Sequence, residues 1–197
     1  AYDRDSIPRR EEDGLRLIYI SKLRQQKRVD VLLNAIALLK NRTQMEDITL
    51  KVIGDGFYMQ EYERIARELG LSKEVRFLGV KNRAEIAGLL AQSDALVISS
   101  PKETFGIPGV EALAAGKPVL STRCGGTDDY IDDTCGLFCQ PNDPEDMAEA
   151  IVELRRRLPS YDPEVLKAVA ARYDKRTVCD RLITVFGELI EKKKQAL

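Results

Sequence analysis

Residues 95–119 decide the fold, and they read ALVISSPKETFGIPGVEALAAGKPV. The apolar run at 95–98 is typical of a buried strand. The Ala- and Gly-rich segment at 107–116 predicts a helix, because Pro108 suits its first position. A further strand is expected at 119–121. Strands that alternate with helices and are apolar throughout indicate a parallel sheet covered on both faces.

The same alternation of strand and helix extends in both directions from this segment. Strands are also expected at 15–20, 48–53, 75–78 and 136–139. Apolar residues at 3-and-4 spacing predict helices at 29–39, 62–69, 86–90 and 143–157. The sequence therefore predicts the α/β class, with a Rossmann-like parallel sheet and helices on both faces.

The two ends of the chain differ from this middle part. Residues 1–14 are rich in charge and show no apolar period, so we expect a linker or extended arm. The domain itself is expected at 15–158, with the helices at 159–197 packing on it. The last helix has an apolar stripe that suits either this core or another domain. The stripe consists of Val178, Leu182, Val185, Phe186 and Leu189.

Composition and charge exclude several classes of protein. With 31 Lys+Arg, 32 Asp+Glu and a net charge of −1, no general attraction to nucleic acid is expected. No apolar run reaches the roughly 18 to 20 residues that span a bilayer, and the first residues do not form a signal peptide. Four cysteines without a disulfide spacing fit a reducing compartment, so we expect a cytoplasmic protein.

Histidine is absent from the chain, which removes every nucleophilic pair and general base that needs an imidazole. Cys135 and Cys139 lie close in sequence, but no histidine or second close pair accompanies them to complete a metal site. We therefore expect neither a metal nor a cofactor.

Polar and Gly-rich residues follow the expected strands. The carboxyl ends of parallel strands meet at one edge of a sheet, where α/β proteins bind ligands. Lys22 and Lys27 can reach an anion there, and the helix start at 106–109 offers backbone N–H groups to a phosphate. These features indicate a phosphorylated ligand. The segments concerned are 21–22, 54–56, 79, 99–106 and 122–126.

Two common phosphate-binding motifs are not matched. The G-D-G at 54–56 lacks the third glycine of the dinucleotide fingerprint, and no G-x-x-x-x-G-K-[ST] occurs. NAD and P-loop nucleotides are therefore disfavoured as ligands.

A series of motifs accompanies Glu103 and Glu111, which are eight positions apart in the central segment. In chain order they are Lys27 with VDVLL at 29–33, VIGDG at 52–56, VRFLG at 75–79, GKPV at 116–119, GG at 125–126 and TCGL at 134–137. Over about residues 15–151 the chain resembles the C-terminal, donor-binding half of the retaining GT-B glycosyltransferases. Within them it is most similar to glycosyltransferase family 4, also called glycosyl transferases group 1.

The resemblance implies a role for each matching charged residue. Glu103 would bind hydroxyls of the donor sugar and Glu111 the ribose of the nucleotide. Lys27 and Lys22 would contact the diphosphate, Lys22 in the place of the family's arginine. Glu103 and Lys27 are the expected catalytic residues.

The resemblance also implies backbone and aromatic contributions to donor binding. The residues concerned are Gly54, Gly79, Phe105, Gly106 and Ile107. The sequence departs from the family at Ser21, where a glycine is usual, and at Asp128 and Asp129, which replace a proline and a glutamate. These changes affect loops beside the expected site.

At the level of the whole protein, the resemblance implies that residues 15–158 bind a nucleotide diphosphate sugar for transfer to an acceptor. The family's N-terminal acceptor domain has no counterpart here, so residues 1–14 would be the interdomain connection and the chain alone should be inactive. A non-catalytic or split module that needs a separate acceptor-domain partner is the alternative. The base, the sugar, the acceptor, the oligomeric state and contact with the cytosolic face of a membrane stay open.

Overall fold

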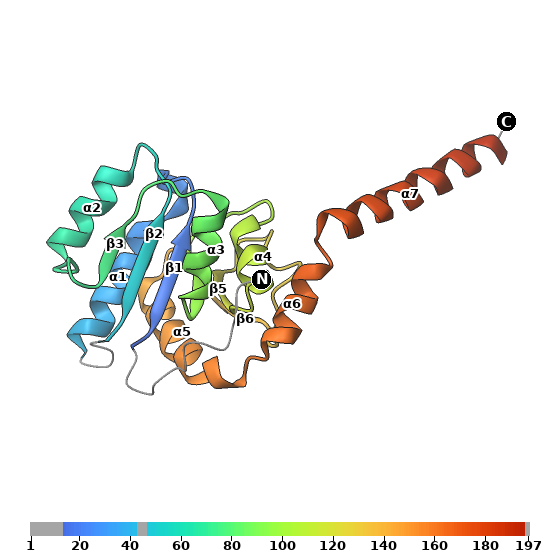
Figure 1. Ribbon diagram of the computed structural model, residues 1–197. Coiled ribbons are helices and arrows are strands. Elements are labelled where there is room, and N and C mark those ends of the chain that lie inside the picture. The colour runs from blue at the N-terminus through green and yellow to red at the C-terminus, as the bar shows by residue number, and fades with distance from the viewer. Residues whose placement is uncertain (1–13, 43–46, 196–197) are drawn as a thin grey trace.

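The structure of the chain, a computed structural model, describes residues 14–42 and 47–195. The arm expected at 1–14 therefore lies outside the described residues, apart from Gly14. Within the described part, six parallel strands form one sheet with helices on both faces (Figure 1). This arrangement confirms the predicted α/β, Rossmann-like fold class.

The strands form a doubly wound sheet. In chain order they are β1 (Arg16–Ile20), β2 (Thr49–Ile53), β3 (Val75–Phe77), β4 (Ala95–Ile98), β5 (Val119–Thr122) and β6 (Gly136–Cys139). Their order in the sheet is β3-β2-β1-β4-β5-β6, and each neighbouring pair is parallel. The chain builds from β1 to one edge, then crosses back to β4 and builds to the other. The direction of winding thus reverses between β1 and β4.

Helices cover the sheet because right-handed crossovers connect its parallel strands. The helices of the described residues are α1 (Val29–Asn41), α2 (Met59–Glu68), α3 (Arg83–Ala91), α4 (Ile107–Ala114), α5 (Pro144–Arg157), α6 (Pro163–Ala171) and α7 (Lys175–Gln195), of which α7 does not cover the sheet. Helix α1 packs against α2 and α5, while α4 packs against α6 (Figure 1).

The core lies between the sheet and these helices. Strand β4 is buried at every position, and α1 buries its apolar face, including Leu32, Leu33 and Ile36. Each such side chain stabilises the fold by about 1.5 to 3 kcal/mol through the water it releases. Burial on both faces explains why the strands are apolar throughout.

An ion pair joins the amino ends of β1 and β4. Asp94, directly before β4, accepts hydrogen bonds from the main-chain nitrogen of Arg16 at 2.9 Å and from its Nε and Nη2 at 3.2 and 2.9 Å. Only 6% of the Asp94 side chain is exposed. The guanidinium fork and the backbone thus occupy both carboxylate oxygens.

The two C-terminal helices differ in their packing. Helix α6 lies on α4, whereas α7 extends away from the body (Figure 1). The apolar stripe of α7 is exposed, with 49% of Leu182 and 59% of Phe186 open to solvent. Asp174 caps α7 as a separate helix by accepting from the N–H groups of Arg176 and Thr177 at 2.7 and 3.0 Å. The structure thus places α7 off the domain, contrary to the expected packing. None of the described helices is long and apolar enough to cross a membrane.

Candidate functional site

A cavity of about 370 Å³ lies at the carboxyl ends of β1 and β4. This is the point where the winding reverses, and it is where doubly wound sheets bind ligands. A cavity of this size suits a small molecule. Its lining comes from the end of β1 and the turn after it, and from the end of β4 and the loop to α4: residues 19–22, 27, 97, 98, 100 and 103–108.

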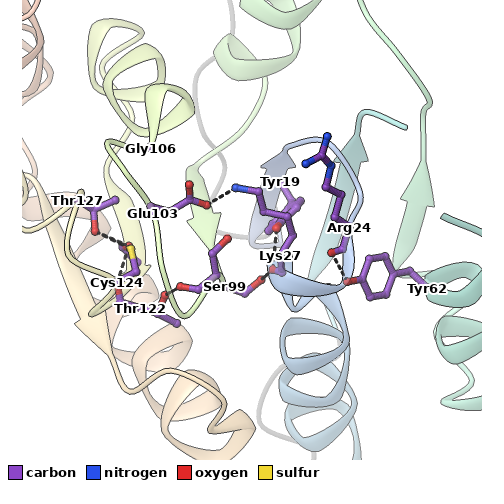
Figure 2. A network of polar contacts seen from close by, with 12 residues as sticks. Tyr19, Arg24, Lys27, Tyr62, Ser99, Glu103, Gly106, Thr122, Cys124 and Thr127 are labelled. Carbon is purple, nitrogen blue, oxygen red and sulfur yellow. Dashed lines mark hydrogen bonds and ion pairs between the residues drawn. The ribbon is translucent and has the colours of Figure 1, made fainter. Parts of the chain in front are cut away.

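Lys27 and Glu103 form an ion pair in the lining of this cavity. Lys27 Nζ lies 2.5 Å from Glu103 Oε1, and the side chains are 21% and 15% exposed (Figure 2). Lys27 follows β1 and Glu103 follows β4, so the pair spans the switch point. Because both charges are partly removed from water, either one would be costly without a partner.

Lys27 is fixed through its main chain. Its carbonyl oxygen accepts hydrogen bonds from Tyr19 Oη at 3.0 Å and from Ser99 Oγ at 2.8 Å (Figure 2). These hydroxyls come from β1 and from the end of β4. Burial raises the pKa of Tyr19 to about 12, so its phenol keeps the proton that it donates. The lysine is thus anchored on the sheet itself.

The turn that leads to Lys27 is also held from the side of β2. Tyr62 of α2 donates a hydrogen bond to the carbonyl of Arg24 at 2.8 Å (Figure 2). The N–H of Leu23 donates to the carbonyl of Asp55 at 2.6 Å. The G-D-G loop therefore supports the turn instead of lining the cavity.

Glu103 is fixed by the loop that follows β5. Its N–H donates to the carbonyl of Cys124 at 3.0 Å, and its carbonyl accepts from the N–H of Gly126 at 3.0 Å. A Cβ at Gly126 would lie 2.3 Å from the main-chain carbon of Thr104, so only glycine permits this close approach. Both members of the ion pair thus stand on restrained backbone.

Helix α4 begins at the cavity. Gly106, its N-cap, has a φ of 74°, which glycine adopts readily. Tyr130 Oη donates to the Gly106 carbonyl at 2.8 Å, which fixes the entry of the chain into the helix. Gly106 and Ile107 line the cavity, so the first N–H groups of α4 and the positive end of its dipole lie beside it.

Lys22 and Phe105 also line the cavity. The Lys22 side chain is exposed. The Phe105 ring packs against Tyr130 and Tyr173, with centroids 5.5 and 5.3 Å apart. Phe105 therefore connects the cavity wall to the segment between α6 and α7.

The other predicted site residues lie outside this cavity. The N–H of Gly54 donates to the carbonyl of Gly79 at 2.8 Å, which joins the carboxyl ends of β2 and β3. Glu111 lies on α4, where partial burial raises the pKa of its carboxyl and Arg83 opposes that shift. The cavity thus brings together Lys22, Lys27, Glu103, Phe105, Gly106 and Ile107, but not Gly54, Gly79 and Glu111.

The roles of the hydroxyl groups around the pair were not predicted from the sequence. Tyr19 and Ser99 hold Lys27, and both are hydroxyl residues at or next to a strand's carboxyl end, which is a signal that could have found them. Two more hydroxyls, Oγ of Ser21 and of Ser100, are buried in the cavity wall without a hydrogen-bond partner among the described residues. Such groups are costly unless a ligand or water satisfies them.

The cysteines do not form a candidate metal site. Among the described residues, no group of three or more Cys, Asp or Glu is placed to hold a metal ion. Burial raises the pKa of the Cys135 thiol to about 11 and that of Cys139 to about 12. Both therefore stay protonated at neutral pH, whereas the thiolate is the form that binds metals.

Solved structures share this arrangement of sheet and helices. Anabaena Alr3699/HepE in complex with UDP and glucose superposes with a TM-score of 0.79 at 24% identity, over 89% of this chain and 49% of that one. The lipopolysaccharide outer core galactosyltransferase WaaB gives a TM-score of 0.80 at 22% identity, over 92% and 51% of the two chains. This chain therefore shares its fold with about half of each of these two chains.

Sequence comparison gives the family. D-inositol 3-phosphate glycosyltransferase of Corynebacterium jeikeium (strain K411) is 30% identical over 183 residues, which make up 87% of this chain and 43% of that protein. The chain thus spans less than half the length of this curated relative. The family described as "Glycosyl transferases group 1" matches residues 3–157. On this match, the chain belongs to the glycosyl transferases group 1 family.

Proposed function

We propose that this chain binds the donor, a nucleoside diphosphate sugar, for a retaining glycosyltransferase. The observation that carries the proposal is the meeting of Lys27 and Glu103 at the switch point, beside Lys22 and the start of α4. A diphosphate requires cations and N–H donors, and a sugar requires acceptors for its hydroxyls. The lining of one cavity offers both.

In the proposed reaction, the bond between the anomeric carbon and the diphosphate oxygen breaks, and negative charge develops on the leaving diphosphate. Lys22, Lys27 and the first N–H groups of α4 stabilise that charge without a metal ion. Glu103 accepts hydrogen bonds from sugar hydroxyls, and Glu111 holds the ribose. The acceptor oxygen bonds to the anomeric carbon from the face that the diphosphate leaves, and the leaving phosphate takes the proton of that acceptor hydroxyl. Configuration is therefore retained and no histidine is needed.

The choice of first ligands rests on the solved structures. HepE has been crystallised with UDP, with UDP and glucose, and with UDP-glucose. This supports uridine nucleotides as the first ligands to try. GDP, ADP and their sugars complete the screen, because the residues that line the cavity do not identify a base.

The acceptor is proposed to bind another domain. The chain spans 43% of its relative and 49% of the HepE chain, so the proposed transfer needs a second α/β domain that closes over the donor and presents the acceptor. We expect this chain alone to bind donor without transferring sugar. If the second domain is instead a separate polypeptide, adding that polypeptide restores transfer. Robust product formation by this chain alone, detected by mass spectrometry, would contradict the proposal.

The test of the proposed site is calorimetric titration of the chain and its Lys27→Ala variant with these nucleotides. Because a charged hydrogen bond contributes about 1.5 to 3 kcal/mol, Lys27→Ala should weaken nucleotide binding about tenfold or more. The control is Lys73→Ala, which should bind like the parent. Lys73 is exposed and lies just before the amino end of β3, whereas the cavity lies at the carboxyl ends of the strands. Equal affinity of the Lys27→Ala variant and the parent would remove Lys27 from the site.

A further inference from the structure

The Lys27–Glu103 ion pair joins two groups that the proposed function assigns to different parts of the donor. Lys27 is proposed to bind the diphosphate and Glu103 the sugar, yet each is the other's partner at 2.5 Å. A diphosphate that approaches Lys27 therefore competes with a carboxylate that already neutralises the lysine. Binding of the donor must rearrange this pair.

The rearrangement is confined to the side chains. Two hydroxyl groups fix the main chain at Lys27, and the loop after β5 fixes the main chain at Glu103 on both sides. Neither residue can follow a ligand by a shift of its loop without losing these bonds. When Lys27 turns to a phosphate, Glu103 therefore stays in the cavity wall, where it is 15% exposed.

The consequence for Glu103 depends on which ligand has bound. With a bare nucleoside diphosphate, the carboxylate loses its cation, gains no donor and stands near another anion, which is unfavourable in a partly dry site. With a nucleotide sugar, the hydroxyl groups of the sugar donate to the carboxylate and replace the lysine. The same residue thus penalises one ligand and binds the other.

We infer that Glu103 is a specificity-determining residue that discriminates the nucleotide sugar from the bare nucleoside diphosphate through its ion pair with Lys27. The inference rests on the proposed function and extends it to the release of product. Once the sugar has been transferred, Glu103 has no hydroxyl partner and reclaims Lys27, which favours departure of the nucleoside diphosphate. Donor binding opens the pair, and product release closes it.

The test compares Glu103→Gln with the parent chain in calorimetric titrations at constant ionic strength. UDP and UDP-glucose are the first ligands, replaced by the matching pair from the nucleotide screen if another base binds. Glutamine keeps the shape and removes the charge that competes for Lys27. Glu103→Gln should bind UDP about three- to tenfold more tightly, because no carboxylate then competes with the diphosphate for Lys27. It should bind UDP-glucose more weakly, because the sugar hydroxyls lose a charged acceptor. Unchanged or weaker UDP binding would overturn the inference.

The matched control is Asp94→Asn, which alters the ion pair at the other end of the same two strands. It should lower the melting temperature and leave the ratio of the two affinities unchanged. If it shifts that ratio as much as Glu103→Gln does, the effect is not local and the inference fails. If the parent binds neither ligand, or Lys27→Ala binds as well as the parent, the proposed function fails together with the inference. If those requirements are met and Glu103→Gln does not tighten UDP, the inference fails alone.

Discussion

Strands β1 and β4 are bridged by an ion pair at each end, and the two pairs are built differently. At the amino ends, Arg16 holds Asp94 with two side-chain nitrogens and its main-chain N–H. At the carboxyl ends, a single contact joins Lys27 Nζ to Glu103 Oε1. Arginine offers a rigid fork of donors, whereas lysine offers a point charge on a flexible stem. The Arg16–Asp94 pair is held by three hydrogen bonds, whereas Lys27 can exchange Glu103 for another partner by breaking a single contact.

The surroundings of the two ion pairs also differ. Lys27 and Glu103 line a cavity, while Asp94 is buried against the backbone that it caps. The two carboxylates are buried to a similar degree, with 6% of Asp94 and 15% of Glu103 exposed. Of the two, only Glu103 lines the cavity, so burial alone does not distinguish the two pairs. A partly buried ion pair therefore indicates a binding site when a single contact holds it and its residues line a cavity.

The largest effect is expected from a change that separates the loops at the carboxyl ends of β4 and β5. In Gly126→Ala the new Cβ meets main-chain atoms of Thr104 and Phe105, so the two loops must separate and Glu103 must move. We expect a loss of about 3 kcal/mol in the free energy of unfolding and loss of measurable UDP-glucose binding. Urea denaturation and calorimetry check both expectations.

The control for Gly126→Ala is Gly88→Ala. A Cβ at Gly88, inside α3, meets no heavy atom within 4 Å. Alanine there should increase stability by up to about 1 kcal/mol, because glycine is a poor helix former. Normal donor binding by Gly126→Ala would show that the position of Glu103 does not depend on the close approach of the loops.

A second change sharpens the comparison from the amino end. Asp94→Ala removes the carboxylate that accepts three hydrogen bonds from Arg16, and should cost about 2 kcal/mol of unfolding free energy. Affinity for UDP should stay that of the parent, since the cavity lies at the other end of the strands. If nucleotide affinity fell as far as in Lys27→Ala, the two ends would not be independent.

A third change separates the two glutamates at the carboxyl end. Glu111→Gln should weaken UDP and UDP-glucose by a similar factor, up to about tenfold, because both contain the ribose. This contrasts with the opposite changes expected for Glu103→Gln. Glu149→Gln, at an exposed position on α5, serves as the control. Circular dichroism first establishes that α4 is intact, and an unaltered affinity for both ligands would remove Glu111 from the site.

The smallest effect is expected where the support of Lys27 is weakened without touching the ligand. Ser99→Ala removes one of two hydrogen bonds to the Lys27 carbonyl, and UDP affinity should fall about threefold. In a Lys27→Ala background the same change should have no further effect on affinity, which a purely structural role would not explain. Ser93→Ala, which removes a buried hydroxyl bonded to Leu89, is the matched control. Equal losses of affinity in both serine variants would contradict a positioning role for Ser99.

The secondary structure of the sheet was predictable because fully buried strands require apolar runs. The strand at 95–98 agrees with β4, and the others agree to within a residue or so at their ends. The order of the strands was not predictable from periodicity, since pairing of β1 with β4 joins segments far apart in sequence. The apolar stripe of α7 predicted a packed helix, but amphipathicity gives only the face and not the partner.

The site was predictable where its residues lie in the loops that follow strands. Lys22 and Gly106 could be placed at the sheet edge in this way, because topology alone gathers strand ends. The contact of Lys27 with Glu103 could not, since 76 positions separate the two and either charge alone suits a solvated surface. The support from Tyr19 was hidden because an aromatic residue in a strand is usually core.

Helix α7 affects how this chain behaves in solution. Its 21 residues, at a rise of 1.5 Å each, make a rod about 30 Å long. A compact chain of 197 residues has a radius of gyration of about 16 Å. A rod of that length pointing away from the body raises hydrodynamic friction without adding mass. A monomer should therefore leave a sizing column earlier than its 22.1 kDa suggests, and light scattering rather than elution volume will give its mass.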